Sequence, residues 1–137
     1  MSKLKETQVN IKIKLSALWA SVLSCYIYCD YFELYTPEKI QGMIDGTTIF
    51  GAGDQNSLLG LSSIMLITSL MIALCVLLPA VINRILNMVV GFIMTLMLAF
   101  LAYSAGWYFY KMYAAIEALL TLCIVWSAWN WPRESKG

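Results

Sequence analysis

Four long apolar stretches, separated by short polar breaks, occupy most of the sequence. Their bounds are Leu15–Leu34, Leu58–Ile82, Leu86–Tyr110 and Met112–Trp131. An α-helix rises about 1.5 Å per residue, so about 20 residues are enough to cross a hydrocarbon core of about 30 Å. The pattern therefore predicts four transmembrane helices in a single integral membrane domain that takes in all 137 residues.

The breaks between the stretches predict how these helices are arranged. Asn83-Arg84 is predicted to join the second and third stretches, and Lys111 to mark the turn between the third and fourth. Connections this short make consecutive helices antiparallel neighbours. The predicted fold class is all-α, a membrane-embedded antiparallel four-helix bundle, with Pro79 kinking the second helix.

The one long connection, 36–56, predicts a short helix of its own. Thr36 is a suitable N-cap, and Pro37 suits the first helical position because its missing N–H is not needed there. Apolar residues follow at helical spacing, and Gly46 suits the C-terminal stop. We therefore predict an amphipathic surface helix over Pro37–Asp45.

The charges predict an orientation in the membrane. Hydrophobic residues make up 61% of the chain and charged residues 12%, against about 25% charged residues in soluble domains. The net charge is only +1, but seven of the nine basic residues lie before the first stretch, between the second and third, or after the fourth: Lys3, Lys5, Lys12, Lys14, Arg84, Arg133 and Lys136. The positive-inside rule then places both termini in the cytoplasm and 36–56 on the outer side.

The first stretch is expected to remain as a helix and not to be cleaved as a signal peptide. It exceeds a signal-peptide core of about 7–15 residues, and no A-x-A site follows it.

Three carboxylates within the apolar stretches are the candidate site residues. They are Asp30 and Glu33, which share one helical face, and Glu117, which lies toward the same outer leaflet. Ionisable groups in spans are costly, about 2.5 kcal/mol or more for a central Asp, so they normally face a bundle interior or water. We expect them to converge on an outer-leaflet pocket, with hydrogen-bond partners among Tyr28, Tyr31, Tyr103 and Lys111. Such a pocket would suit proton exchange, cation binding or recognition of an amine. In the alternative, the two acids of the first stretch lie among hydrated lipid headgroups, and Glu117 forms a hydrogen bond with a neighbouring helix.

Most catalytic and metal chemistry lacks its residues here. The chain has four cysteines without a C-x-x-C pair and no histidine, so zinc, haem and thioredoxin-like sites lack ligands or spacing. A nucleophile elbow and a phosphate loop are also missing from the sequence, and we predict no catalytic residue, no metal and no cofactor. Cys25 and Cys29, one helical turn apart, are the sole hint of a quinone-linked membrane oxidoreductase.

These features favour a non-enzymatic membrane component or partner subunit. Binding or transport of a small ligand, proton or ion through the carboxylate pocket is the alternative. The lipid bilayer is the first predicted partner. A second copy of the chain or another membrane protein is a further possible partner. Small residues at four-residue spacing permit close helix packing within the bundle or between copies, namely Ala102 with Gly106 and Ala114 with Ala118. A nucleic-acid partner is not predicted, because the basic N-terminus is short and continues into an apolar helix.

Two segments carry a resemblance to a known family. The first is Tyr26–Pro37, which closes the first stretch with tyrosines around two acids; the second begins at Glu117 and continues through Ile124-Val125-Trp126, Ala128-Trp129 and Trp131-Pro132. With the four-span layout, they resemble a family of small uncharacterised bacterial membrane proteins that is classed as a domain of unknown function. This resemblance implies a bacterial inner-membrane location and brings no known activity. The chain is also similar, in architecture alone, to DoxX-like four-helix proteins.

Overall fold

The structure is a computed structural model that describes residue 4 and residues 7–48 and 51–132. Its elements, in chain order, are α1 (Ile11–Glu33), α2 (Lys39–Ile44), β1 (Thr47–Thr48), β2 (Gly51–Ala52), α3 (Gln55–Leu77), α4 (Ala80–Ser104) and α5 (Tyr108–Trp129). The two strands form one antiparallel pair of two residues each. The fold is otherwise all-α, as the sequence predicts.

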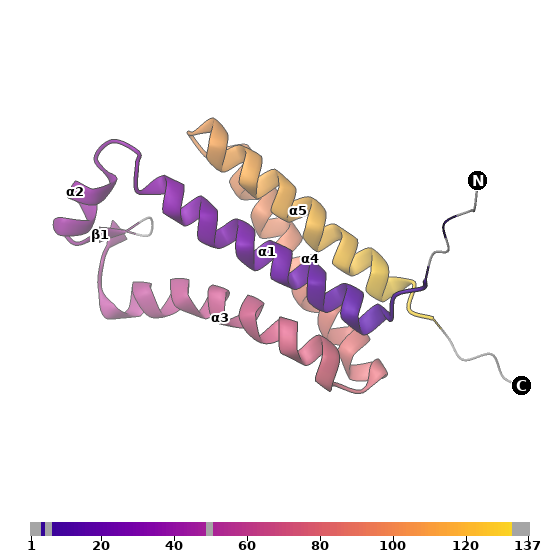
Figure 1. The fold of residues 1–137 in the computed structure, drawn as a ribbon. Coiled ribbons are helices and arrows are strands. Elements are labelled where there is room, and N and C mark those ends of the chain that lie inside the picture. The colour runs from indigo at the N-terminus through magenta and orange to yellow at the C-terminus, as the bar shows by residue number, and fades with distance from the viewer. Residues whose placement is uncertain (1–3, 5–6, 49–50, 133–137) are drawn as a thin grey trace, which may run out of the picture.

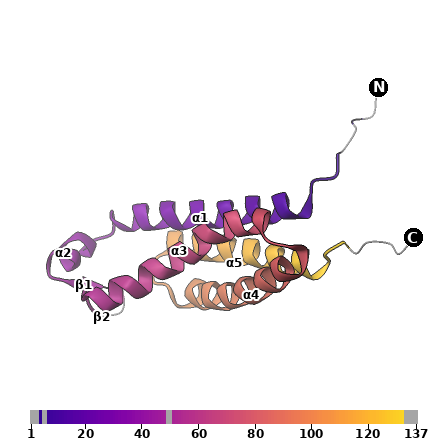
Figure 2. The same ribbon diagram turned by 90° about the horizontal axis from the view of Figure 1, so that it is seen from below.

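The four long helices are not packed in chain order. α1 lies between α3 and α5, and α5 packs along α4. α3 and α4 follow each other in the chain, yet they share few contacts. Figure 1 shows the first and last helical residues at one end of the molecule, with α2 and β1 at the other, and Figure 2 shows the same arrangement from below. We call the end with α2 and β1 the α2 end.

Two predicted turns were wrong. Leu78 is extended (ψ 150°) before Pro79, which disfavours helix in the preceding residue and cannot donate a backbone hydrogen bond, so α3 ends there. Pro79 therefore separates α3 from α4 and does not kink a helix, and Asn83-Arg84 lies inside α4. Lys111 likewise lies in the first turn of α5, because the preceding turn is formed by 105–107.

The predicted surface helix exists but is shorter than Pro37–Asp45. The Thr36 hydroxyl donates to the Glu33 carbonyl at 2.7 Å, so Thr36 closes α1 and does not cap α2. Glu38 precedes α2 in a left-handed conformation (φ 67°), which delays the start of that helix. The predicted stop is confirmed: Gly46 follows α2 with φ 71°, a conformation that glycine adopts readily.

Polar side chains cap the first turns of α1 and α3. Asn10 accepts the Lys12 N–H at 2.9 Å, and Asp54 accepts the Ser57 N–H at 2.9 Å. Each bond satisfies one backbone donor that the helix leaves unpaired. Hydrogen bonding from Ser57 holds the pKa of the Asp54 carboxyl below its usual value.

Basic side chains cap two C-termini at the opposite end. The Lys12 ammonium donates to the Leu78 carbonyl at 2.7 Å, just past α3. The Arg84 guanidinium donates to Ala128 at 3.2 Å and to Trp129 at 3.3 Å, at the end of α5. A cation at a helix C-terminus pairs with unsatisfied carbonyls and with the negative end of the helix dipole. Two of the bases that predict orientation therefore also join neighbouring helices.

Buried positions recur in steps of three and four along the helices. In α1 they are Leu15, Trp19, Val22, Tyr26 and Cys29, and in α5 they include Ala114, Glu117, Thr121, Ile124 and Ala128. This spacing gives each helix one buried seam that faces its neighbours. One core position on α5 is therefore occupied by a carboxylic acid.

Gly91 marks the closest approach of α4 to α5. A Cβ at Gly91 would lie 2.9 Å from Val125 Cγ2, whereas a Cβ at Gly60 in α3 would meet no atom within 4 Å. We expect Gly91→Ala to lower the free energy of unfolding by about 1 kcal/mol through overpacking. The same change at Gly60 should raise it by about 0.5 kcal/mol, because alanine restricts the unfolded chain and favours helix. Thermal unfolding in detergent measures both; equal shifts of one sign would contradict the close contact.

Candidate ligand cavity

A cavity of about 1240 Å³ lies at the α2 end. Its walls come from α1, α2, α3 and α4, the loop residues beside α2 and the start of α5. Apolar side chains form most of the wall, among them Leu58, Leu61, Met65, Met97 and Leu101. Small-molecule pockets usually measure about 300–1,000 Å³, so this cavity is large enough for a lipophilic molecule of drug size or more.

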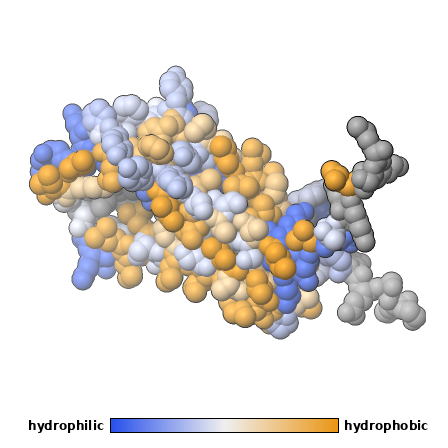
Figure 3. Space-filling view, in the orientation of Figure 1, coloured by the Kyte–Doolittle hydropathy of each residue, from blue (hydrophilic) through white to orange (hydrophobic). Residues whose placement is uncertain are grey.

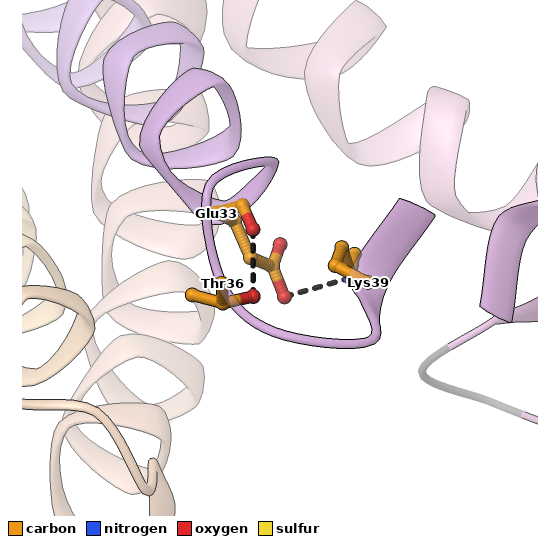
Figure 4. Close-up of polar contacts among 3 residues, drawn as sticks. All are labelled: Glu33, Thr36 and Lys39. Carbon is orange, nitrogen blue, oxygen red and sulfur yellow. Dashed lines mark hydrogen bonds and ion pairs between the residues drawn. The ribbon is translucent and has the colours of Figure 1, made fainter. Parts of the chain in front are cut away.

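Charged groups lie at one part of the cavity wall. Asp30 and Glu33 line it from α1, and Lys39 lines it from α2. The Lys39 ammonium pairs with Glu33 Oε1 at 2.7 Å, and both side chains are about three-quarters buried, with 23% exposed. Figure 4 shows this pair together with the Thr36 hydroxyl that closes α1. The ion pair fastens α2 to the end of α1 and thereby helps to form the cavity wall.

Aromatic rings also line the cavity. The lining includes Tyr26, Tyr31, Phe100, Trp107 and Tyr110. Tyr31 is held in place, because its hydroxyl lies 2.9 Å from that of Tyr35 and its ring meets the Tyr35 ring edge to face at 5.6 Å. The hydrogen bond with Tyr31 raises the pKa of the Tyr35 phenol above its usual value.

Three of the predicted site residues meet at this cavity, namely Asp30, Glu33 and Tyr31. Glu117 does not line it: this side chain is 2% exposed and belongs to the helix core. Within the described part of the chain, Glu117 Oε1 is buried without a hydrogen-bond partner. The expected convergence of three acids is therefore reduced to two acids on the cavity and one in the core.

The remaining predicted partners lie elsewhere. Tyr28 and Tyr103 are 58% and 87% exposed, and Lys111 is half-buried; the cavity wall includes none of these three. Lys39 takes the place predicted for Lys111 as the cation beside the acids. A sequence signal for Lys39 existed, since it follows Glu33 by six residues across a turn that contains Pro37.

The core also contains a polar network that the sequence interpretation missed. Asn87 Oδ1 accepts from Trp19 Nε1 at 2.7 Å and from Cys75 Sγ at 3.3 Å, and Asn87 Nδ2 donates to Asn83 Oδ1 at 2.7 Å. The Asn83 amide in turn donates to the Cys75 carbonyl. All four residues have no exposed surface, and they connect α1, α3 and α4. The available signal was Asn87, a polar residue inside an apolar stretch that needs a partner, one helical turn after Asn83 in the preceding break.

Redox and metal chemistry receive no support from the side-chain arrangement. Cys25 and Cys29 are free thiols on α1 and do not line the cavity. Over the described ranges, no group of three or more His, Cys, Asp or Glu side chains gathers as a metal site would need.

Within the residues that the structure describes, three helices, α3, α4 and α5, are long and apolar enough to cross a membrane. α1 has 23 residues but does not join them by this measure, because it includes serines, tyrosines and Asp30 among its apolar residues. Figure 3 shows hydrophobic residues over the middle of the long helices and hydrophilic ones toward the two ends. Many large apolar side chains on these helices are exposed, such as Phe100, Leu119 and Trp126. This surface indicates membrane association.

Comparison with known proteins gives a family and no activity. Neither the curated proteins nor the solved structures contained a match to this chain. One family model matches residues 2–136, which is nearly the whole sequence. The chain therefore belongs to the family of unknown function DUF6326.

Proposed function

We propose that this protein is a non-enzymatic, multi-pass membrane protein that binds a small lipophilic ligand in the cavity at the α2 end. The observation that carries this proposal is the cavity itself, about 1240 Å³ in volume, with mostly apolar walls and one charged part. Binding sites typically combine such walls with a few polar groups that orient the ligand. Because α3 and α4 pack little against each other, a space remains that the ligand would occupy.

In this proposal all four long helices cross the membrane. α1 serves as the fourth span because it is 23 residues long and packs between two strongly apolar helices. The distribution of Lys and Arg supports cytoplasmic termini and an outer α2 end. The family resemblance of the two aromatic and acidic segments supports a bacterial inner membrane, and the cavity would then open in its outer leaflet.

A larger side chain in the cavity wall should weaken binding. Leu61 lines the cavity from α3, and Leu61→Trp adds a bulky ring to that wall. We expect the variant to bind a lipophilic probe, dodecanol, at least about tenfold more weakly than the unchanged protein, because the ring takes the space of the alkyl chain. Equilibrium dialysis with radiolabelled dodecanol and protein in phosphatidylcholine nanodiscs measures the difference.

The matched control is Leu119→Trp on α5. Leu119 is 62% exposed and lies outside the cavity wall, so the same substitution should leave dodecanol binding unchanged. Empty nanodiscs give the amount of dodecanol that dissolves in the lipid. Binding no greater than that of empty nanodiscs, or an equal loss in both Trp variants, would contradict the proposal.

A second candidate function, proton or cation exchange, is favoured by Glu117. Among the described residues, Glu117 Oε1 is buried in the core without a hydrogen-bond partner, which costs free energy of folding. Ionisable groups of this kind in membrane helices commonly serve transport. Four spans are few for a transporter, which usually needs two repeats around a central site. Exchange would therefore require a second copy of the chain, and a strict monomer in detergent would argue against it.

A further inference from the structure

The charged part of the cavity indicates the chemical class of its ligand. On the basis of the proposed function, we infer that the cavity takes a cationic amphiphile, with its ammonium head beside Asp30 and its alkyl chain along the apolar wall of α3 and α4. Three observations carry this inference: the charge balance of the lining, the aromatic rings that line the same cavity, and the apolar remainder of the wall.

The charge balance leaves one negative group available. The charged side chains of the lining are Asp30, Glu33 and Lys39. Lys39 is paired with Glu33 at 2.7 Å, so these two charges offset each other. Among the described residues, the Asp30 carboxylate has no ion pair and no hydrogen bond to a side chain, and it is exposed. A ligand that enters therefore meets a net charge of −1, from two acids and one base.

The aromatic lining fits the same head group. Ammonium ions bind over the faces of Trp and Tyr rings, and the attraction increases where water is excluded. Tyr31, Trp107 and Tyr110 line the cavity together with Asp30. A carboxylate with several aromatic rings is a common arrangement for holding organic cations, and it offers little to a neutral head group.

An anionic head fits the lining less well. The base that would receive it, Lys39, already donates to Glu33. A carboxylate or phosphate head would have to break that ion pair and would also lie near the unpaired charge of Asp30. Repulsion by two acids against one base therefore selects against fatty acids and anionic lipids.

Three probes with one alkyl chain and different heads test the inference. Dodecylammonium, dodecanol and dodecanoate are each dialysed against the full chain in phosphatidylcholine nanodiscs at neutral pH. We expect dodecylammonium to bind most tightly, and Asp30→Asn to weaken its binding by about tenfold, the effect of one well-placed charged contact. Dodecanol has no charge to pair with Asp30, so Asp30→Asn should weaken dodecanol binding much less than dodecylammonium binding. Comparing variants at one probe removes differences in how the probes dissolve in lipid.

Two further variants keep the test decisive. Asp45→Asn removes an exposed acid at the end of α2 that does not line the cavity, and it should have no effect. Lys39→Gln makes the charge of the lining more negative and should tighten dodecylammonium binding. A cavity wall loosened by loss of the ion pair would weaken binding, so it cannot mimic this result. Equal binding of all three probes, or tightest binding of dodecanoate, would overturn the inference and leave the proposed function standing. Absence of binding by every probe would overturn both.

Discussion

Asn87→Ala is expected to be the most damaging single substitution in the core, lowering the free energy of unfolding by about 3 kcal/mol. Its amide connects three helices: it accepts from Trp19 and from Cys75 and donates to Asn83. The substitution leaves the buried Trp19 N–H without its acceptor and also opens a small cavity. Burying a donor without a partner costs about 1–3 kcal/mol of folding free energy, and the lost packing adds to this cost.

Thermal or denaturant unfolding in mixed micelles, followed by tryptophan fluorescence, measures this loss. Asn130→Ala is the control, because Asn130 is exposed and its side chain donates to the Trp126 carbonyl at the end of α5. A double variant, Trp19→Phe with Asn87→Leu, removes both partners and should recover part of the stability. A loss at Asn87 no larger than at Asn130 would show that the network contributes little.

In contrast to Asn87→Ala, Glu117→Leu is expected to stabilise the protein and to raise its free energy of unfolding by about 2 kcal/mol. Glu117 occupies a core position of α5 with 2% of its surface exposed, and its Oε1 is buried without a partner within the described residues. Leucine suits that position, so the substitution replaces an unsatisfied polar group by apolar packing. A stabilised variant would indicate that the carboxyl is retained for a function and not for folding.

Thr121→Val is the matched comparison, one turn further along the same seam. The Thr121 hydroxyl lies 2.8 Å from that of Thr95 on α4 and is also 3.0 Å from the Glu117 carbonyl. Because this group is satisfied, its removal should lower stability by about 1 kcal/mol. The same unfolding measurement applies to both. If Glu117→Leu also destabilised the protein, the carboxyl would be structural, and the second candidate function would fail.

Much of the architecture follows from the order of residues. Long apolar runs predict long helices because a helix satisfies its backbone hydrogen bonds within one segment, whereas a strand needs neighbouring strands. The same runs place Asp30 and Glu33 near the end of the first helix. The two misplaced turns show the limit of this approach. A helix can continue through polar residues such as Asn83 when a neighbouring helix satisfies them, whereas the backbone effect of Pro79 ends a helix inside an apolar run.

Tertiary packing decides the rest. The main neighbour of α3 is α1, although α4 follows α3 directly in the chain, and hydropathy alone does not predict this packing. The packing leaves a space between α3 and α4 that forms part of the cavity. The spacing of Lys39 and Glu33 permits their pairing, but the pairing also depends on a turn in which Glu38 is left-handed, and the sequence does not predict that conformation. Glu117 and Asp30 are both acids near apolar residues in the sequence, yet one lies in the core and the other at the cavity. Periodicity within one helix determines which residues share a face, and only the neighbouring helices determine what that face contacts.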